Sequence, residues 1–450
     1  MHRLQPSTTA AAPVSVVAKL ERYFEFAALA TNWRTEILAG FTTFITMAYI
    51  VVVNPAILHE AGMPLAAVTA ATCLSAAIGS ILMGVLARYP IALAPGMGLN
   101  AYFTYSVVVG LHVPWQVALG AVFISGVVFV LLTVTGLRQK ILRSIPHQLY
   151  PAVAGGIGLF IALIGLKNAG IIVANSSTMI SLGNVRSPET ALALFGVLLV
   201  AALQVWQVRG GMLIGRVGTA LSGWTLGLVH WHPEPYNLSA ITATAFKLDL
   251  RGAFRFGILE IIFVFLFVDL FDNLGTLVAV TKKAGLIREE HEIPRVDRIL
   301  LADATATICG SLAGTSTVTS YVESAAGVAA GGRSGFAAIT TGILFLVALF
   351  LAPFLGVLPP AATAPALIVV GSLMLSTISE IHWNDPLVAF PAFLTLIMIP
   401  LTYSIASGLG FGMIAYACLR LIRGQVSRED WLLYVLAALF LLRFVFMAKS

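Results

Sequence analysis

The chain of 450 residues is 59% apolar and only 10% charged, with a net charge of +6. Soluble domains carry about 25% charged residues, and so few polar side chains could not cover the surface of a water-soluble protein of this size. A soluble domain, a disordered chain, a coiled coil and a nucleic-acid-binding domain are therefore excluded. We predict an all-α polytopic membrane protein whose surroundings are the lipid bilayer.

The chain begins with a charged segment that precedes seven apolar stretches. Residues 1–34 mix charges of both signs and lack a compact apolar core, so we expect a cytoplasmic N-terminal segment and no cleavable signal peptide. The third stretch is rich in Gly and is interrupted by Pro95. In chain order the seven stretches are Glu36–Leu58, Leu65–Leu86, Ile91–Gly110, Val117–Val134, Pro151–Leu166, Ala191–Val208 and Met212–Val229.

A polar stretch, His230–Arg255, separates these from a second set of seven. A helix needs about 20 residues to cross the hydrocarbon, and several stretches are shorter, so we expect some to be tilted, broken or buried in protein. The second set is Phe256–Val280, Ile299–Leu312, Gly314–Ala330, Phe336–Leu358, Pro365–Ser379, Leu387–Thr402 and Leu409–Leu421.

Lys and Arg residues are more frequent on one side of this arrangement. The clusters at 138–143 and 282–283 fall on the same side as the N-terminus, which favours a multi-pass protein of the cell (inner) membrane with the N-terminus and residue 424 in the cytoplasm. A last apolar run, Trp431–Met447, fits either a fifteenth span or a helix in the membrane interface. Its marginal length and the polar residues at 427–430 favour the interfacial helix.

No motif indicates an enzyme or a metal site. Cys73, Cys309 and Cys418 lie inside apolar runs without metal-type spacing, and His230 and His232 have no nearby carboxylate or Cys partners. The sequence contains neither a Walker motif nor a Ser elbow. We therefore expect a protein that needs no cofactor and does not hydrolyse ATP.

The third stretch of each set contains a string that is not typical of a continuous helix. The strings are Ala94–Phe103 (APGMGLNAYF) and Gly314–Glu323 (GTSTVTSYVE). An odd number of spans per set inverts the second set, and paired broken segments at matching positions of inverted repeats indicate a transport site. One such segment alone would more simply let helices pack closely. Two at equivalent positions favour a site.

The second set carries carboxylates within apolar sequence. Asp269 and Asp272 lie in the middle of the eighth stretch, and Asn273 follows on the same helix face. An ionised Asp at the centre of a span costs about 2.5–3.5 kcal/mol. A polar stripe between helices is one explanation, but carboxylates without a Lys or Arg in the same span better fit substrate or proton binding. Glu323 ends the second broken string, and Asp303 is either a coupling carboxylate or a helix-end residue near the cytoplasmic surface.

These strings resemble the AzgA-like branch of the nucleobase:cation symporter-2 family, which contains adenine, guanine and hypoxanthine permeases. The resemblance covers about residues 20–425, and its motifs are Ala94–Phe103, Phe267–Thr276, Ala302–Ala306, Gly314–Gly327 and Phe390–Thr395. It implies the uracil-permease fold, with 14 transmembrane segments in two inverted repeats of seven and short strands in segments 3 and 10. A core domain would comprise residues 35–136 and 254–358. A gate domain would comprise residues 149–231 and 361–424, followed by the helix at 430–447.

The resemblance also implies roles for single residues. Asp269 and Glu323 occupy the two carboxylate positions used for base binding and proton coupling, and Asn100 occupies a purine-binding position of the third segment. Asn273 stands where uracil permeases have a His, so uracil is a poor substrate candidate. The implied substrate-binding residues are Asn100, Asp269, Glu323, Gly98, Tyr321, Val322, Phe103 and Phe267, and the implied proton-coupling residues are Asp269, Asp272, Glu323 and Asp303.

The resemblance and the residues together predict a secondary active transporter that imports purine bases (hypoxanthine, guanine or adenine) with protons, by elevator-like alternating access. A carboxylate can accept the N1–H of a 6-oxopurine and the exocyclic amine of guanine. An anion transporter of the same general fold, such as a sulfate or bicarbonate carrier, and a channel or receptor for bases are alternatives; the carboxylates argue against the former. The preferred base, the proton number, a homodimer and the stacking aromatic (Phe103, Phe267 or Phe271) are left open.

Overall fold

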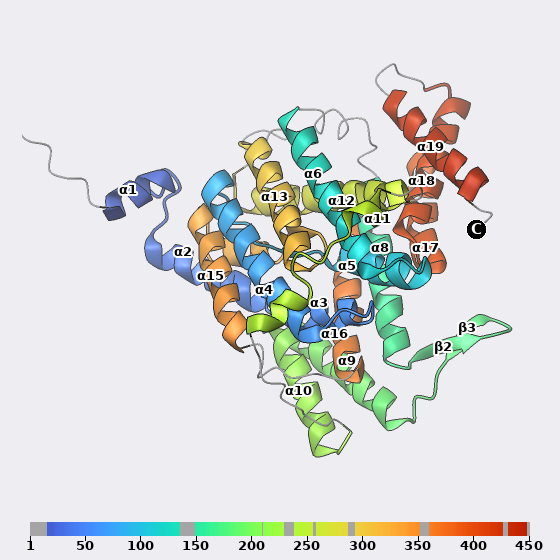
Figure 1. The fold of residues 1–450 in the computed structure, drawn as a ribbon, viewed down its shortest axis with the longest axis horizontal. Helices are drawn as coiled ribbons and strands as arrows, with labels where there is room; N and C mark the ends of the chain where they lie inside the picture. The colour runs from blue at the N-terminus through green and yellow to red at the C-terminus, as the bar shows by residue number, and fades with distance from the viewer. Residues whose placement is uncertain are drawn as a thin grey trace, which may run out of the picture.

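The fold is a body of helices that contains two short antiparallel strand pairs. Figure 1 shows the helical body and one of the two strand pairs at its edge. The computed structural model describes residues 16–135, 149–208, 210–228, 238–254, 258–286, 293–351, 360–425 and 431–447. The first half contains α1 (Val16–Tyr23), α2 (Trp33–Met47), α3 (Ile50–His59), α4 (Leu65–Leu82), the π-helix η1 (Met83–Ala87), β1 (Leu93–Pro95), α5 (Met97–Ala101), the π-helix η2 (Tyr102–Gly110), α6 (Trp115–Val134), α8 (Leu149–Asn168), β2 (Ile172–Asn175), β3 (Met179–Leu182), α9 (Pro188–Val205) and α10 (Gly211–Thr225). The second half contains the 3₁₀-helix η3 (Leu238–Ala243), α11 (Leu250–Ala253), α12 (Ile258–Lys283), α13 (Val296–Ala313), β4 (Val318–Ser320), α14 (Ser324–Ala329), α15 (Gly335–Leu351), α16 (Pro360–Met374), the 3₁₀-helix η5 (Leu375–Glu380), α17 (Pro386–Thr402), α18 (Ile405–Ile422) and α19 (Trp431–Met447).

Length and apolar composition identify the membrane helices. Among the described residues, six helical stretches are long and apolar enough to cross a membrane, and several shorter apolar helices accompany them. Local sequence sets the helix ends: α17 begins where the Asp385 side chain accepts a hydrogen bond from the Leu387 amide. Helix α13 ends where Gly314 takes a φ of +98°, which other residues rarely adopt. The prediction of a helical polytopic membrane protein is confirmed.

The helices pack in two groups. In the first group, α15 packs on α2 and α4, and α13 packs on α4 and α6. In the second group, α16 packs on α8 and α9, and α17 packs on α8 and α18. Helix α12 packs on α6 of the first group, and the second group meets it and its neighbours where α8 contacts α5 and α12, α18 contacts α12, and α16 contacts α3. The second group therefore lies next to α5 and α12, which are close to the strand pair formed by β1 and β4.

The first strand pair joins segments from the two halves of the chain. β1 and β4 are antiparallel, with Leu93 opposite Ser320 and Pro95 opposite Val318. Further backbone hydrogen bonds extend the pairing at both ends, from the Gly96 amide to the Thr317 carbonyl (2.9 Å) and from the Tyr321 amide to the Ala92 carbonyl (3.0 Å). The strands are buried and contain only three residues each.

Hydroxyl groups on neighbouring helices form hydrogen bonds with the backbone amides and carbonyls on the outer edges of this pair. Ser80 of α4 accepts from the Leu93 amide and donates to the Leu93 carbonyl, both at 3.0 Å. Thr307 of α13 serves Val318 in the same way, donating to its carbonyl at 2.9 Å and accepting from its amide at 3.3 Å. Backbone polar groups at membrane depth need partners inside the protein, and one side chain on each side supplies them here.

Two further features differ from, or add to, the predicted elements. The hairpin β2–β3, which the sequence did not indicate, projects from the helical body (Figure 1). Helix α19 packs on α18, where the Phe411 and Phe444 rings lie 4.8 Å apart and Phe440 lies against Gly410. Whether α19 crosses the membrane or lies in its interface stays a prediction.

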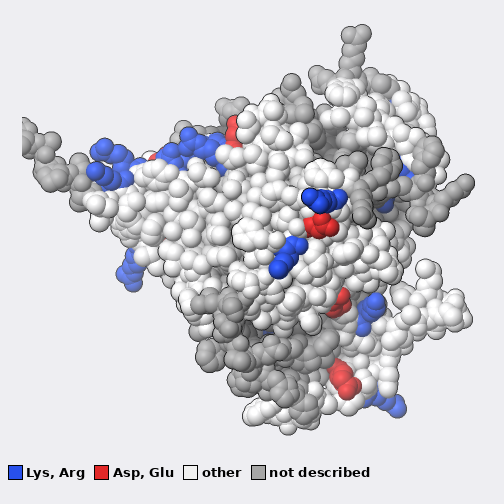
Figure 2. Space-filling model, viewed as in Figure 1, with Lys and Arg blue, Asp and Glu red and all other residues white. Residues whose placement is uncertain are grey.

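On the face seen in Figure 2, charged side chains form small groups separated by broad uncharged areas. A group of ion pairs joins the segment after α1 to the first helix group. Glu25 pairs with Arg88 at 3.0 Å and with Arg295 at 3.2 Å. These contacts hold the segment that precedes α2 against the ends of η1 and α13.

Candidate functional site

The site is built around the β1–β4 pair, because both broken strings lie there. Each strand is followed within three residues by a short helix, α5 after β1 and α14 after β4. Because the strands are antiparallel, these helices leave from opposite ends of the pair. A three-residue strand extends about 10 Å. Asn100 therefore lies toward one end of the pair and Glu323 lies at the other, with α12 packed against β4, α5 and α14.

Asn100 lies in α5 and is fully buried. Its Oδ1 accepts a hydrogen bond from the Ser316 hydroxyl at 2.5 Å. Within the described residues, no acceptor meets its Nδ2. A buried amide donor without a partner is costly unless a ligand or water meets it, so this group is a candidate ligand contact.

Glu323 immediately precedes α14, and its Oε1 accepts a hydrogen bond from the Tyr49 hydroxyl at 2.7 Å. Tyr49 is almost fully buried at the junction of α2 and α3. The neighbouring Val322 side chain is 53% exposed. The carboxylate is thus oriented by a residue from the first span while its neighbourhood is open.

Helix α12 brings further polar groups to the strand pair. Asp269 and Asn273 are both fully buried within it. Among the described residues, neither the oxygen nor the nitrogen of the Asn273 amide has a hydrogen-bond partner. The Asp272 side chain lies outside the described part of the structure. A second buried polar amide therefore lies one helical turn from Asp269.

The other predicted substrate-binding residues have contacts within the protein. The Tyr321 hydroxyl donates to the Pro95 carbonyl across the strand pair. Phe267 stacks on Phe263 with centroids 5.2 Å apart. Phe103 is buried with its ring 6.4 Å from that of Phe265, in a tilted arrangement. Tyr321 therefore links the two broken segments.

Gly98 lies where the two helix groups pack closely at the site. A Cβ built at Gly98 would lie 2.5 Å from Cγ2 of Ile157, which belongs to α8. No side chain fits there without movement of the neighbour. Gly98 therefore sets the contact between α5 and α8 at the boundary.

Asp303 does not lie at a helix end, which was one of the two interpretations of this residue. Helix α13 begins at Val296, so Asp303 lies well inside the helix, and it is fully buried. The alternative of a helix-end residue near the cytoplasmic surface is therefore wrong. The charged residues Asp297 and Arg298 belong to the first turn of α13, and this hid the true start of the helix.

Three polar residues that the sequence did not single out are important in the structure. Tyr49 and Ser316 contact Glu323 and Asn100, and Arg216 is fully buried in α10, with no described hydrogen-bond partner for Nε or Nη1. A cation within an apolar stretch was the available signal for Arg216. The other two residues had no signal beyond polarity, because their partners are distant in sequence.

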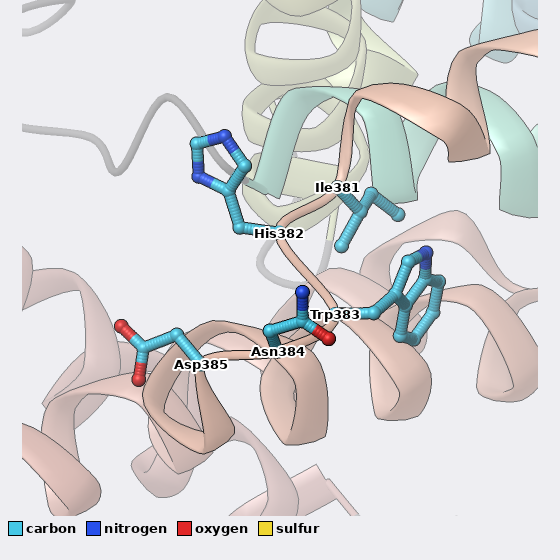
Figure 3. A pocket seen from close by; sticks show the side chains of 5 residues that line it. All are labelled: Ile381, His382, Trp383, Asn384 and Asp385. Carbon is cyan, nitrogen blue, oxygen red and sulfur yellow. The ribbon is translucent and has the colours of Figure 1, made fainter.

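Other parts of the described chain offer little for a ligand. No group of three or more His, Cys, Asp or Glu side chains in those residues could hold a metal ion. A surface pocket lies in the turn between η5 and α17 and is lined by five consecutive residues, Ile381 to Asp385 (Figure 3). None of them is a candidate site residue, so the strand pair remains the site.

Similarity to known proteins covers nearly the whole chain. The model of the Permease family (Xan_ur_permease) matches residues 34–445. A protein of Methanocaldococcus jannaschii is 50% identical, with 95% of this chain and 99% of that protein covered. The guanine/hypoxanthine permease PbuG of Bacillus subtilis is 47% identical (95% and 100% covered), and the adenine permease AdeP of Escherichia coli is 43% identical (95% and 96% covered).

Solved structures share the fold at low sequence identity. The transmembrane domain of a cyanobacterium bicarbonate transporter, BicA, aligns with a TM-score of 0.62 and 16% identity, covering 83% of this chain and 97% of that one. The murine solute carrier 26 family member A9 anion transporter, in its inward-facing state, aligns with a TM-score of 0.64 and 12% identity, covering 94% and 75%. At these identities the likeness concerns the fold alone.

Proposed function

The chain belongs to the Permease family, and we propose that it is a secondary active transporter that imports purine nucleobases. The relatives named as adenine and guanine/hypoxanthine permeases support this substrate class. The observation that carries the proposal is the pair of polar groups at the two ends of β1–β4. These are a buried amide donor on Asn100 and a carboxylate acceptor on Glu323.

The chemistry of this pair fits a purine. The base lies along the strand pair between α5 and α14, with α12 beside it. Glu323 accepts the N1–H of a 6-oxopurine and, in guanine, the exocyclic amine, since one carboxylate can accept two neighbouring donors. Asn100 donates to an acceptor at the other end of the base. Asp269 lies on the adjoining helix as the second carboxylate.

Protons drive the import in this proposal. Asp269 and Glu323 are the principal coupling groups, with Asp303 and Asp272 as further candidates, because carboxylates at membrane depth are typical of proton relays. No cofactor is required. In this proposal the N-terminus is cytoplasmic and the protein lies in the cell (inner) membrane.

Alternating access would proceed by an elevator-like movement of one helix group against the other. In this proposal 14 segments form two inverted repeats of seven, and a core domain (35–136 and 254–358) carries the base past a gate domain (149–231 and 361–424). The helix at 430–447 follows as an additional element. The close contact of Gly98 with Ile157 across the boundary of the groups supports such a sliding surface.

Uptake by proteoliposomes tests the function. Radiolabelled hypoxanthine should accumulate above the external concentration, and unlabelled guanine or adenine should compete while uracil should not. A protonophore should abolish accumulation, and replacement of sodium by choline should not affect it. Sulfate or bicarbonate uptake without purine uptake would identify an anion transporter instead. Binding of purine without accumulation would identify a channel or receptor. Strict sodium dependence of purine uptake would exclude proton coupling.

A further inference from the structure

We propose that Ser316 is a positioning residue that fixes the Asn100 side-chain amide so that this residue acts as a hydrogen-bond donor toward the base. The inference rests on the proposed function and adds a determinant of specificity to it. A side-chain amide has an acceptor end and a donor end, and either can face a ligand. Which end faces the ligand depends on the partner that holds the other end.

The partner in this structure is the Ser316 hydroxyl, which donates to Asn100 Oδ1 at 2.5 Å. Both side chains are fully buried, so water does not compete for this hydrogen bond. The oxygen end of the amide is thereby occupied. Nδ2 remains as the end available to a ligand, and no described group accepts from it.

The backbone holds both side chains in register. The Asn100 amide donates to the Gly96 carbonyl at 2.8 Å, and the Gly96 amide donates to the Thr317 carbonyl at 2.9 Å. Gly96 thus connects the helix that carries Asn100 with the residue next to Ser316. These backbone hydrogen bonds therefore fix the positions from which the Asn100 and Ser316 side chains meet.

A fixed donor selects a base by its acceptors. Adenine, hypoxanthine and guanine all carry unprotonated ring nitrogens at positions 3 and 7 of common tautomers, and a carbon at the contacted position leaves Nδ2 without an acceptor. An unsatisfied buried donor weakens binding by about tenfold or more. Asn100 Nδ2 can thus donate to several purines, whereas an analogue that lacks the contacted ring nitrogen binds more weakly.

The test measures inhibition of hypoxanthine uptake by 3-deaza and 7-deaza hypoxanthine in the wild-type protein and in variants. In the wild type, one analogue should inhibit about tenfold more weakly than hypoxanthine. In Ser316→Ala the amide is free to rotate, so this discrimination should fall below about threefold, whereas Ser316→Thr, which keeps the hydroxyl, should retain it. Ser125→Ala is the matched control, because Ser125 is also buried and, among the described residues, its hydroxyl donates within its own helix, to the Val122 carbonyl.

The outcomes separate this inference from the proposed function. If the wild type takes up no purine, the proposed function fails. If the wild type transports purines but Ser316→Ala discriminates as the wild type does, or neither analogue is disfavoured in the wild type, only the role of Ser316 is overturned. Should Ser316→Ala fail to reach the membrane, Asn100→Asp provides the second measurement. It replaces the donor by an acceptor, so hypoxanthine uptake should be lost at normal membrane levels of the variant, and uptake with an unchanged KM would overturn the inference.

Discussion

Replacement of Tyr49 by Phe should weaken the apparent affinity for purine without disturbing the fold. Tyr49 is 2% exposed, and Phe fills the same space apart from the hydroxyl. The substitution therefore removes the donor that lies 2.7 Å from Glu323 Oε1 and little else. Without it, the carboxylate loses the hydrogen bond that holds it in place.

The size of the effect follows from the type of hydrogen bond. A hydrogen bond to a charged group contributes about 1.5–3 kcal/mol, and each 1.4 kcal/mol is about tenfold in an equilibrium constant. We therefore expect the KM for hypoxanthine to rise about ten- to hundredfold. Glu323→Gln should raise it by a similar factor, because the amide no longer offers the anionic acceptor.

A double-mutant cycle decides whether the two residues act as a unit. Initial rates of radiolabelled hypoxanthine uptake are measured for the wild type, Tyr49→Phe, Glu323→Gln and the double variant, at matched amounts of membrane-inserted protein. Coupled residues give a double variant little worse than either single one. Tyr434→Phe is the control, because the Tyr434 hydroxyl in α19 has no hydrogen-bond partner among the described residues. Fully additive effects, or an unchanged KM in Tyr49→Phe, would refute the assignment.

Three further changes test other parts of the site. Asp269→Asn should keep base-for-base exchange but lose uphill uptake driven by a pH gradient in liposomes, since an amide cannot carry the proton; uptake at the wild-type rate would exclude Asp269 as the coupling group. Gly98→Ala should lower the uptake rate severalfold at normal membrane levels, because the new Cβ would lie 2.5 Å from the Ile157 side chain, and a normal rate would show that α8 yields easily. Thr307→Val should lower the thermal midpoint of the detergent-solubilised protein, because the Val318 amide and carbonyl both lose their hydrogen bonds to the Thr307 hydroxyl. The expected loss in the free energy of unfolding is about 1–3 kcal/mol, and an unchanged midpoint would contradict this.

The sequence was most informative where a single segment determines its own structure. Apolar runs indicated the helices, and Gly, Pro95 and the Ser/Thr run at 314–320 marked the two strings in which β1 and β4 lie. The start of α13 was missed because charged residues form its first turn, which misplaced the depth of Asp303.

Contacts between distant segments had no such signal. Tyr49 and Glu323 are 274 positions apart, and Asn100 and Ser316 are 216 apart. Only the folded chain brings them together. The hairpin β2–β3 was also missed. Its two strands have only four residues each and are mostly exposed, so they lack the alternation of apolar and polar residues that identifies a half-buried strand.

The hydrogen bonds of β1 constrain how the protein is made as well as how it works. The Ala92 amide donates to the Ser324 hydroxyl 232 positions later, and the Pro95 carbonyl accepts from the Tyr321 hydroxyl 226 positions later. A ribosome that has completed β1 has not yet produced these partners, and lipid offers no substitute for them. The newly inserted first half must therefore shelter this backbone in water or in the insertion machinery until β4 emerges. The β1–β4 pair can therefore form only after the second half of the chain has been synthesised as far as Ser324.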